Sequence, residues 1–415
     1  MGCGKTVFRI STFLEFSLES SSKNKLLTFL TLFCFFMLNG QDFKEKAYER
    51  IGHQVVELAN GFLKQSPVTV TSFVSSRSSG TKNDFYSEGD YWWPDIENPE
   101  GPYIRKDGFT NPNNFTAHRE VLMKMGEMVG TLTSAYLITK DRTYSDAALE
   151  HCKAWFLNES TRMNPNFLYA QAIKGRHTGR GIGIIDGIHF MDAVQSLRVL
   201  ENEGLISENL MIGFRSWFSE LLEWLMTHEY SKDEMVHPNN HGTCWNMQVA
   251  TYAKFCNNSR VLKFCKANFK NTILPGQMAK DGSFPLELER TKPYGYSLFN
   301  LDAMTMNGWI LSDSKQCLWS YDRNGLSLLT AVEFMAPFVA EKEEWPLEPD
   351  VMYWEEWPVA HPSFLLAAII YNRLDFYKLW SENQHFPKTF EVKRNMAIKS
   401  PLIWLYDANR CVSPE

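Results

Sequence analysis

Several patterns that mark common protein classes are missing from this chain. It has no clustered run of Lys and Arg, and its net charge at pH 7 is −6. Phosphate binding needs concentrated positive charge, so we expect no nucleic-acid partner. There is also no Cys-x-x-Cys pair, no His-Glu-x-x-His motif and no phosphate-binding loop. The sequence therefore predicts neither a metal site nor a cofactor.

Long apolar runs are equally scarce. The one clear candidate, Leu26 to Gly40, comes directly after Lys23 and Lys25. It is short for a membrane span, which needs about 20 residues, and its charged-then-apolar order is typical of a secretory signal. We expect residues 1–40 to be a secretion leader and the protein to be secreted or periplasmic. No stable membrane insertion is expected after leader removal, an uncleaved anchor being the alternative.

Cysteines are few and scattered. Two of the eight fall within the expected leader. The spacing of the others does not indicate a disulfide framework, so we expect buried free thiols. These six are Cys152, Cys244, Cys256, Cys265, Cys317 and Cys411.

Aromatic side chains, in contrast, are abundant: they make up 14% of the chain and include 13 Trp. Two interpretations stay open on composition alone. The rings could fill a large core, which the 44% of hydrophobic residues allows. They could also line a carbohydrate groove, because flat rings stack on sugar faces.

Residues 41–112 divide into a helix and a long loop. Ala47, Ile51 and Val55 recur at helical spacing. The stretch from Ser75 to Phe109 is polar, aromatic and rich in Gly and Pro, and loops of that length are usually lids or binding elements. Trp92 is a candidate to stack on a ligand; the alternative is a hydrophobic plug that holds the loop down.

Residues 113–415 are dominated by helical periodicity. Segments of 12 to 20 residues with apolar stripes alternate with short turns, and few stretches alternate as strands do. No fixed sequence repeat is visible, which disfavours a solenoid. We predict an all-α domain: an α/α toroid, that is, an incomplete barrel of antiparallel helix pairs, with the long aromatic-rich lid loop before it.

Two amides and a histidine crowd one predicted helix start. Asn239, Asn240 and His241 come directly after Pro238, and an apolar helical pattern begins immediately after them. A helix N-terminus has unpaired N–H groups and partial positive charge, which suit a carboxylate. Trp245 lies one turn later on the same face. The alternative is an ordinary helix cap beside a structural histidine.

A second stretch places Arg290 and Lys292 close to Tyr294 and Tyr296. Nearby positive charge favours a phenolate, so either tyrosine could act in proton transfer. The alternative is that both tyrosines pack in the core with bonded hydroxyls.

A third stretch supplies cations to a glycine-rich region. Arg176 and Arg180 are candidate substrate-binding residues there, and His189 lies a short distance after them. No strand precedes the glycines, so they do not indicate a dinucleotide site.

One reaction uses all three stretches. In a uronic-acid polysaccharide, the glycosidic bond can be broken by β-elimination, without water. Neutralising the carboxylate makes the neighbouring C5 proton easier to remove. A base then takes that proton and an acid protonates the departing O4, and a tyrosine can do both from one face of the ring.

The quoted stretches resemble a known family. "NNHGTCWNMQVATYAKF", "DGSFPLELERTKPYGYSLFNLDA", "TRMNPNFLYAQAIKGR" and "GRGIGIIDG" look like the alginate lyase domain of polysaccharide lyase families five and thirty-eight. The resemblance runs from about Asn113 to Trp309. It implies an α/α toroid that cleaves alginate, polymannuronate or glucuronan, with an acidic polysaccharide as its partner.

The resemblance also implies residue roles. Asn240 and His241 match the carboxylate-neutralising pair, Arg290 the arginine before the catalytic tyrosine, and Tyr296 that tyrosine. Tyr294 is the competing assignment. Substrate contacts are expected from a wider set: Asn239, Trp245, Arg176, Arg180, His189, Tyr294, Lys292 and Trp92.

Two other functions stay open. An α/α-toroid glycoside hydrolase acting on acidic oligosaccharides needs two carboxylates about 5 to 9.5 Å apart, for which Glu287, Glu289 and Asp186 are candidates. A non-catalytic glycan-binding protein would keep the aromatic and basic side chains but would not need Tyr296.

Overall fold

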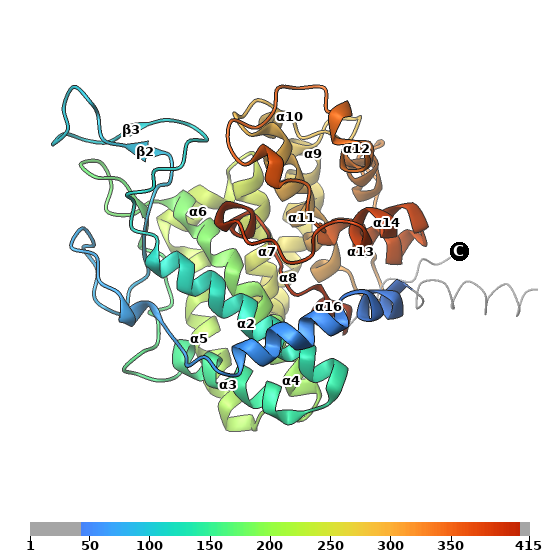
Figure 1. The fold of residues 1–415 in the computed structure, drawn as a ribbon, viewed down its shortest axis with the longest axis horizontal. Helices are drawn as coiled ribbons and strands as arrows, with labels where there is room; N and C mark the ends of the chain where they lie inside the picture. Colours follow the sequence, from blue (N-terminus) through green and yellow to red (C-terminus); the bar gives the residue numbers. More distant parts are fainter. Residues whose placement is uncertain (1–42, 407–415) are drawn as a thin grey trace, which may run out of the picture.

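The computed structural model describes residues 43–406, so the expected leader lies outside the described residues. A helix over residues 43–62 comes first, and it buries Ala47, Ile51 and Val55 as predicted. Helices make up most of the rest of the described chain, which confirms the all-α prediction (Figure 1). Of the described helices, none combines the length and apolar character that crossing a membrane requires.

The helices and strands have these bounds. The α-helices are α2 (Ala117–Thr139), α3 (Arg142–Phe156), α4 (Met191–Asn202), α5 (Glu208–Thr227), α6 (Glu229–Met235), α7 (Asn240–Phe255), α8 (Ser259–Asn268), α9 (Leu274–Gln277), α10 (Pro285–Leu288), α11 (Pro293–Leu311), α12 (Leu328–Ala340), α13 (Pro362–Tyr371), α14 (Leu374–Ser381), α15 (Phe390–Arg394) and α16 (Pro401–Trp404). The 3₁₀ helices are η1 (Val70–Ser72), η2 (Gly181–Phe190), η4 (Lys342–Glu344) and η5 (Trp354–Glu356). The element η3 (Phe269–Ile273) is a π-helix. The strands are β1 (Tyr86–Glu88), β2 (Trp92–Trp93), β3 (Ile104–Arg105) and β4 (Tyr169–Ala172).

Helices α7 and α11 form the centre of the helical body. They pack along each other, and α4, α5, α8 and α13 contact one or both of them (Figure 1). Nearly all residues of both helices are buried, polar ones included. Buried polar groups need partners, and Asn246 of α7 donates to Asn307 of α11 over 2.7 Å. The first turns of these two helices carry Asn240, His241 and Tyr296, and Arg290, the fourth predicted catalytic residue, lies just before α11.

The stretch from Ser75 to Phe109, which we call the lid segment, contains three short β-strands and is not a loop throughout. Strand β1 pairs in parallel with β4, and β2 pairs antiparallel with β3. The pair β2–β3 projects from the helical body (Figure 1). Strands of two or three residues are too short to leave an alternating sequence pattern, which is why only a loop was predicted.

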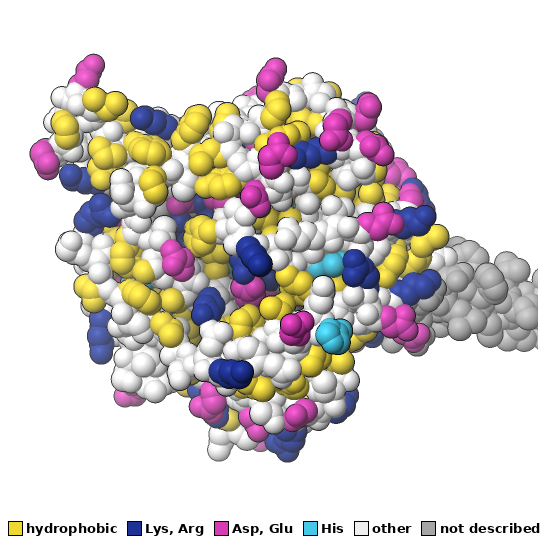
Figure 2. Space-filling model, in the orientation of Figure 1, with side chains coloured by type: hydrophobic (Ala, Val, Ile, Leu, Met, Phe, Trp, Pro, Cys, Tyr) yellow, Lys and Arg dark blue, Asp and Glu magenta, His cyan; other side chains and the backbone are white. Residues whose placement is uncertain are grey.

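Surface charge is mixed on the face drawn in Figure 2. Basic and acidic side chains alternate over the helical body, and hydrophobic side chains gather on the projecting part that carries β2 and β3.

The cysteines match the prediction in part. Cys152, Cys244, Cys256 and Cys265 are free thiols. Cys317 is disulfide-bonded, so the expectation of a free thiol was wrong there.

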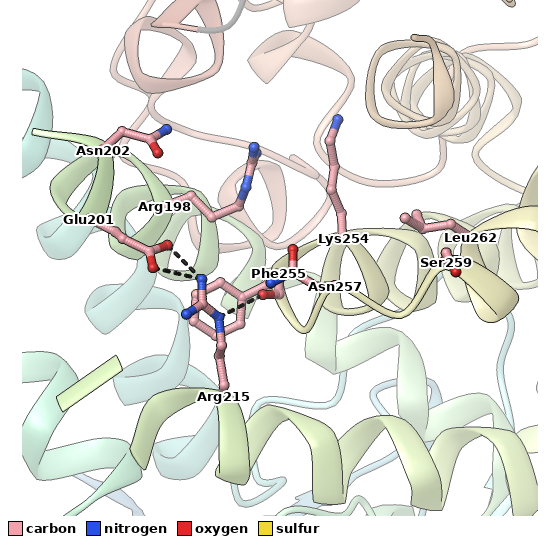
Figure 3. A pocket seen from close by; sticks show the side chains of 9 residues that line it. All are labelled: Arg198, Glu201, Asn202, Arg215, Lys254, Phe255, Asn257, Ser259 and Leu262. Atoms are coloured by element: carbon pink, nitrogen blue, oxygen red, sulfur yellow. Dashed lines mark hydrogen bonds and ion pairs between the residues drawn. The ribbon is translucent and has the colours of Figure 1, made fainter. Parts of the chain in front are cut away.

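A pocket of about 650 Å³ lies at the far end of α7 from its first turn (Figure 3). Arg215 points towards Glu201 there, and two N–O distances of 2.7 Å join the two side chains. Phe255, which lines this pocket, lies fifteen residues after Asn240 on α7. At a rise of about 1.5 Å per residue, the two ends of the helix are about 22 Å apart.

Candidate active site

Helix α7 begins at the predicted Asn-His cluster. The Asn239 side chain accepts from the N–H of His241 over 3.3 Å, so Asn239 is the helix cap. The N–H of Asn240 donates to Oε1 of Glu287, on α10, over 2.7 Å. The helix N-terminus therefore already binds a carboxylate of the protein itself. The expectation that the backbone here receives a substrate carboxylate needs correction for the Asn240 N–H, which Glu287 occupies, while the side chains of Asn240 and His241 keep the predicted role.

Gly242 lets this first turn fold tightly. A Cβ added there would lie 2.3 Å from the carbonyl oxygen of His237. Any larger residue would push the start of α7 away from the preceding turn and displace His241.

His241 is fixed through one ring nitrogen. Its Nδ1 lies 2.8 Å from Oε1 of Glu234, on α6. The Glu234 side chain is fully buried, whereas 17% of the His241 side chain is exposed. Nε2 is therefore the ring nitrogen that can reach a ligand.

The start of α11 positions Tyr296. Pro293 occupies its first turn, and the Asp350 carboxylate accepts from the N–H groups of Tyr294 and Gly295, both over 2.9 Å. Burial raises the pKa of Asp350 to about 6, although these two N–H groups act to lower it. This long-range cap fixes the turn from which Tyr296 extends.

Tyr296 lies among cations, as predicted. The guanidinium carbon of Arg290 is 4.4 Å from its ring centre, and Nζ of Lys292 is 5.4 Å away. Burial nevertheless raises the pKa of the phenol above its ordinary value, while Lys292 and Arg290 act to lower it. The expected direction of the cation effect is right, but burial outweighs it.

Tyr294 points elsewhere. Its hydroxyl donates to the carbonyl of Phe338 over 2.9 Å, and its ring packs edge-on against Trp345 and Trp354. It is completely buried in the core. The competing assignment of Tyr294 as the proton-transfer group does not fit this position.

Glu287 interacts with both predicted motifs, the Asn-His cluster at the start of α7 and the stretch that contains Arg290 and Tyr296. Burial raises the pKa of its carboxyl to about 7, and the Asn240 N–H, Arg290 and His241 act in the opposite direction. The Glu287 carboxylate is thus close enough to both motifs to interact with each.

Two side chains of the lid segment complete the surroundings of Tyr296. The Tyr91 hydroxyl is 2.5 Å from that of Tyr296 and donates to Glu391 over 3.3 Å. Asp107 accepts from Arg290 and from Thr291, both over 3.1 Å. No sequence signal marks these contacts, because Tyr91 is one of many lid aromatics.

The lid segment approaches the body closely at Asp107. Gly108, the next residue, has a φ of +77°, and a Cβ there would lie 2.3 Å from the Thr291 hydroxyl. Glycine suits this position because it adopts a positive φ without strain and has no Cβ to collide with Thr291.

The predicted Trp92, Arg176 and Arg180 come together. The two guanidinium carbons lie 5.5 and 5.7 Å from the centre of the Trp92 ring. Burial, and then repulsion from Arg105, lower the pKa of Arg180 to about 10. An aromatic face flanked by cations is a suitable surface for an acidic sugar.

Two predicted substrate contacts do not fit the structure. Trp245 is buried, and its Nε1 donates to Ser231 over 2.6 Å. His189 is buried as well, with Nδ1 3.0 Å from Nζ of Lys399. Both side chains therefore have structural partners that the prediction did not include, although burial alone does not separate them from Asn240 and Tyr296, which are buried as well. Lys292 is also buried, and it pairs with Glu391.

Within residues 43–406, no three His, Cys, Asp or Glu side chains group as metal ligands would. Metal independence stays a prediction that the structure does not test.

Comparison with known proteins gives consistent matches. The family model "Alginate lyase" matches residues 69–345. The crystal structure of an alginate lyase from Bacteroides ovatus is 29% identical, with a TM-score of 0.74, over 89% of this chain and 97% of that one. A variant of alginate lyase A1-III complexed with a tetrasaccharide is 12% identical, with a TM-score of 0.51, over 87% and 94%. This second likeness shows the fold alone. No curated protein matches.

These findings define the class first: the protein is a polysaccharide lyase built on an incomplete α/α toroid, as predicted. More closely, the chain belongs to the alginate lyase family, whose model spans well over half of it.

Proposed function

We propose that this protein cleaves uronic-acid polysaccharide, alginate above all, by β-elimination, and leaves a 4,5-unsaturated uronate at the new non-reducing end. The observation that carries the proposal is the buried Tyr296 beside Arg290, linked through Glu287 to Asn240 and His241. Membership of the alginate lyase family supports it.

Each group has a step in this scheme. Asn240, His241 and Arg290 neutralise the substrate carboxylate, which stabilises the negative charge that develops when C5 loses its proton. Tyr296 takes that proton as the phenolate, the form that Lys292 and Arg290 favour against the effect of burial. The C4–C5 double bond then forms, the C4–O4 bond breaks, and O4 takes the proton from Tyr296. No water is consumed, and the tyrosine ends as it began.

A single tyrosine favours particular sugars. The C5 hydrogen and the C4–O4 bond lie on one face in mannuronate and in glucuronate, but on opposite faces in guluronate. One phenol can serve both steps only in the first two. We therefore propose mannuronate blocks of alginate as the preferred substrate, with glucuronan as the alternative.

The hydrolase alternative has less support. Asp186 accepts from Arg119 and from Ser87, both buried, and Glu287 accepts from the start of α7. Both carboxylates therefore have structural partners. Glu289, the third candidate, is exposed.

A substrate screen tests the proposal. The purified protein is incubated with polymannuronate, polyguluronate, glucuronan and hyaluronan, and the ultraviolet absorbance of the conjugated uronate is recorded over time. We expect the fastest rise with polymannuronate. A rise with polyguluronate alone would contradict the same-face scheme, and no rise with any substrate would contradict lyase activity on these uronans.

A secreted or periplasmic location is part of the proposal. The leader-like pattern of residues 1–40 supports it. The disulfide of Cys317 does too, because disulfides persist in oxidising compartments.

A further inference from the structure

Glu234 is a buried carboxylate to which the proposed elimination assigns no role. Its side chain is fully buried on α6, and Oε1 contacts Nδ1 of His241. The other oxygen, Oε2, has no hydrogen-bond partner within residues 43–406. Burying a charged group is costly unless a partner compensates it, and the His241 ring is the partner in contact with this carboxylate. Such a placement calls for an explanation beyond packing.

The segment that carries Glu234 is tied firmly to α7. Ser231, one turn before Glu234, accepts from Nε1 of Trp245 over 2.6 Å and donates to the carbonyl of Leu225 over 2.5 Å. Trp245 lies one turn after His241 on α7. Both partners of the Glu234–His241 contact are thus held by a second bond between the same two helices. This also gives the buried Trp245 a structural role.

We propose that Glu234 is a positioning residue, which fixes the proton of His241 on Nδ1 and so turns Nε2 towards the substrate carboxylate. The proposal deepens the proposed function and rests on it. A carboxylate on each side of the ring, Glu234 at Nδ1 and the substrate at Nε2, holds the ring doubly protonated. The ring then donates to the substrate as charge grows during C5 deprotonation.

Other charged and titratable groups surround this pair. Glu287 of α10 attracts His241, and the ring of His237 is 5.5 Å from that of His241. Arg180, just before η2, interacts with Glu234. None of these three side chains bonds to Nδ1, whereas Glu234 does, so Glu234 is the group placed to set the proton there.

The test compares Glu234→Gln with Glu229→Gln, a matched change at an exposed glutamate of the same helix. Glutamine keeps the size of the side chain but can donate to Nδ1 and shift the ring proton. We expect Glu234→Gln to lower kcat by about 10²–10³-fold, at most as much as loss of the His241 donor through which it acts, with little change in KM or Tm. Glu229→Gln should leave kcat unchanged.

The ring protons are read directly by NMR of the full chain labelled with nitrogen-15 histidine, the His241 signals being assigned with a His241→Asn variant. We expect Nδ1 of His241 to be protonated in the unmodified protein and to lose that state in Glu234→Gln. A proton on Nε2 alone in the unmodified protein would overturn the proposal, whether or not the variant folds. So would a folded Glu234→Gln with the kcat of Glu229→Gln.

Failure of the proposed function is distinguishable from these outcomes. If the unmodified protein forms no unsaturated product from any uronan, lyase activity fails, while the NMR result still decides whether Glu234 fixes the ring.

Discussion

The two ends of helix α7 both carry basic side chains, yet they differ in what surrounds them. At the C-terminal end, the pocket in Figure 3 holds Arg215 in a two-point ion pair with Glu201, and Lys254 donates to the carbonyl of Ile310 over 2.8 Å. About 22 Å away, the N-terminal end holds His241, which interacts with Glu287, and Glu287 also interacts with Arg290, whose guanidinium lies over the ring of the buried phenol Tyr296.

The difference shows that a surface pocket lined by basic side chains is not enough to identify the candidate active site. What the N-terminal end adds is a group that can transfer a proton, next to donors that can neutralise a carboxylate. Cations are paired with protein carboxylates at both ends, Arg215 with Glu201 and Arg290 with Asp107, so the contrast lies in the Tyr296 phenol and in His241. Five variants or pairs of variants test this contrast, from the largest effect to the smallest.

Tyr296→Phe should remove nearly all turnover. The phenol acts as base and then acid, and loss of such a group costs about 10²–10⁴-fold in kcat or more. Tyr294→Phe is the matched control, because its hydroxyl only bonds Phe338 in the core. Initial rates of both variants on polymannuronate decide the point. If Tyr294→Phe is the inactive variant, the assignment is wrong.

Asn240→Ala and His241→Ala should each lower kcat by about 10²–10³-fold, the range for losing one donor to a developing oxyanion. KM should change less, because the donors matter most as charge grows. A methyl-esterified substrate, already neutral at the carboxyl group, should be much less sensitive to either change. Full kcat in the folded fraction, together with a large loss of stability, would reduce the cluster to a helix cap and a structural histidine.

Tyr91→Phe should lower kcat by roughly 2- to 10-fold. The change removes one hydrogen bond to Tyr296, and such a bond contributes about 0.5–1.5 kcal/mol. Steady-state kinetics of Tyr91→Phe and Tyr103→Phe, a second lid tyrosine, give the comparison. Equal rates for the two variants would show that the lid contact does not assist the phenol.

Asp107→Asn should lower Tm modestly, in a pH-dependent way. Burial acts to raise the pKa of Asp107, but Arg290 and Arg105 outweigh it and lower the pKa from 3.8 to about 2. A lowered pKa means that the stabilisation is fully present above pH 3.8 and is lost as the pH falls through about 2. The Tm difference between the two proteins should therefore vanish near pH 2. A difference that grows in acid would contradict the ion pair.

Arg215→Gln should leave kcat and KM on polymannuronate unchanged, because the pocket at the far end of α7 has no part in the reaction. A partly exposed ion pair contributes at most about 1 kcal/mol, so only a small drop in Tm is expected. A loss of activity comparable to that of His241→Ala would show that the pocket at the C-terminal end of α7 also takes part in the reaction, which would contradict the proposed difference between the two ends.

Sequence reasoning predicted the two helix starts, where the signal is local, although Asn239 was expected to contact substrate and the helix cap was only the alternative. Asn239 caps α7 and Tyr296 lies in the first turns of α11, and both helix starts are marked by nearby proline and polar residues. The all-α architecture was predicted in the same way, from helical periodicity.

The partners of those residues could not be predicted. Tyr91 reaches Tyr296 across 205 positions and Glu287 reaches Asn240 across 47, and no short-range pattern records such pairings. Trp245 illustrates the opposite error: a position on the same helical face as His241 predicted a substrate contact, but α6 covers that side chain.

The most direct test of the account is the mass of the products. Polymannuronate is digested with the unmodified protein and with Tyr296→Phe, and the oligosaccharides are measured by mass spectrometry. β-Elimination predicts products one water lighter than hydrolysis products, formed by the unmodified protein and nearly absent with the variant. Saturated products, or unsaturated products formed equally fast by Tyr296→Phe, would contradict elimination by this tyrosine.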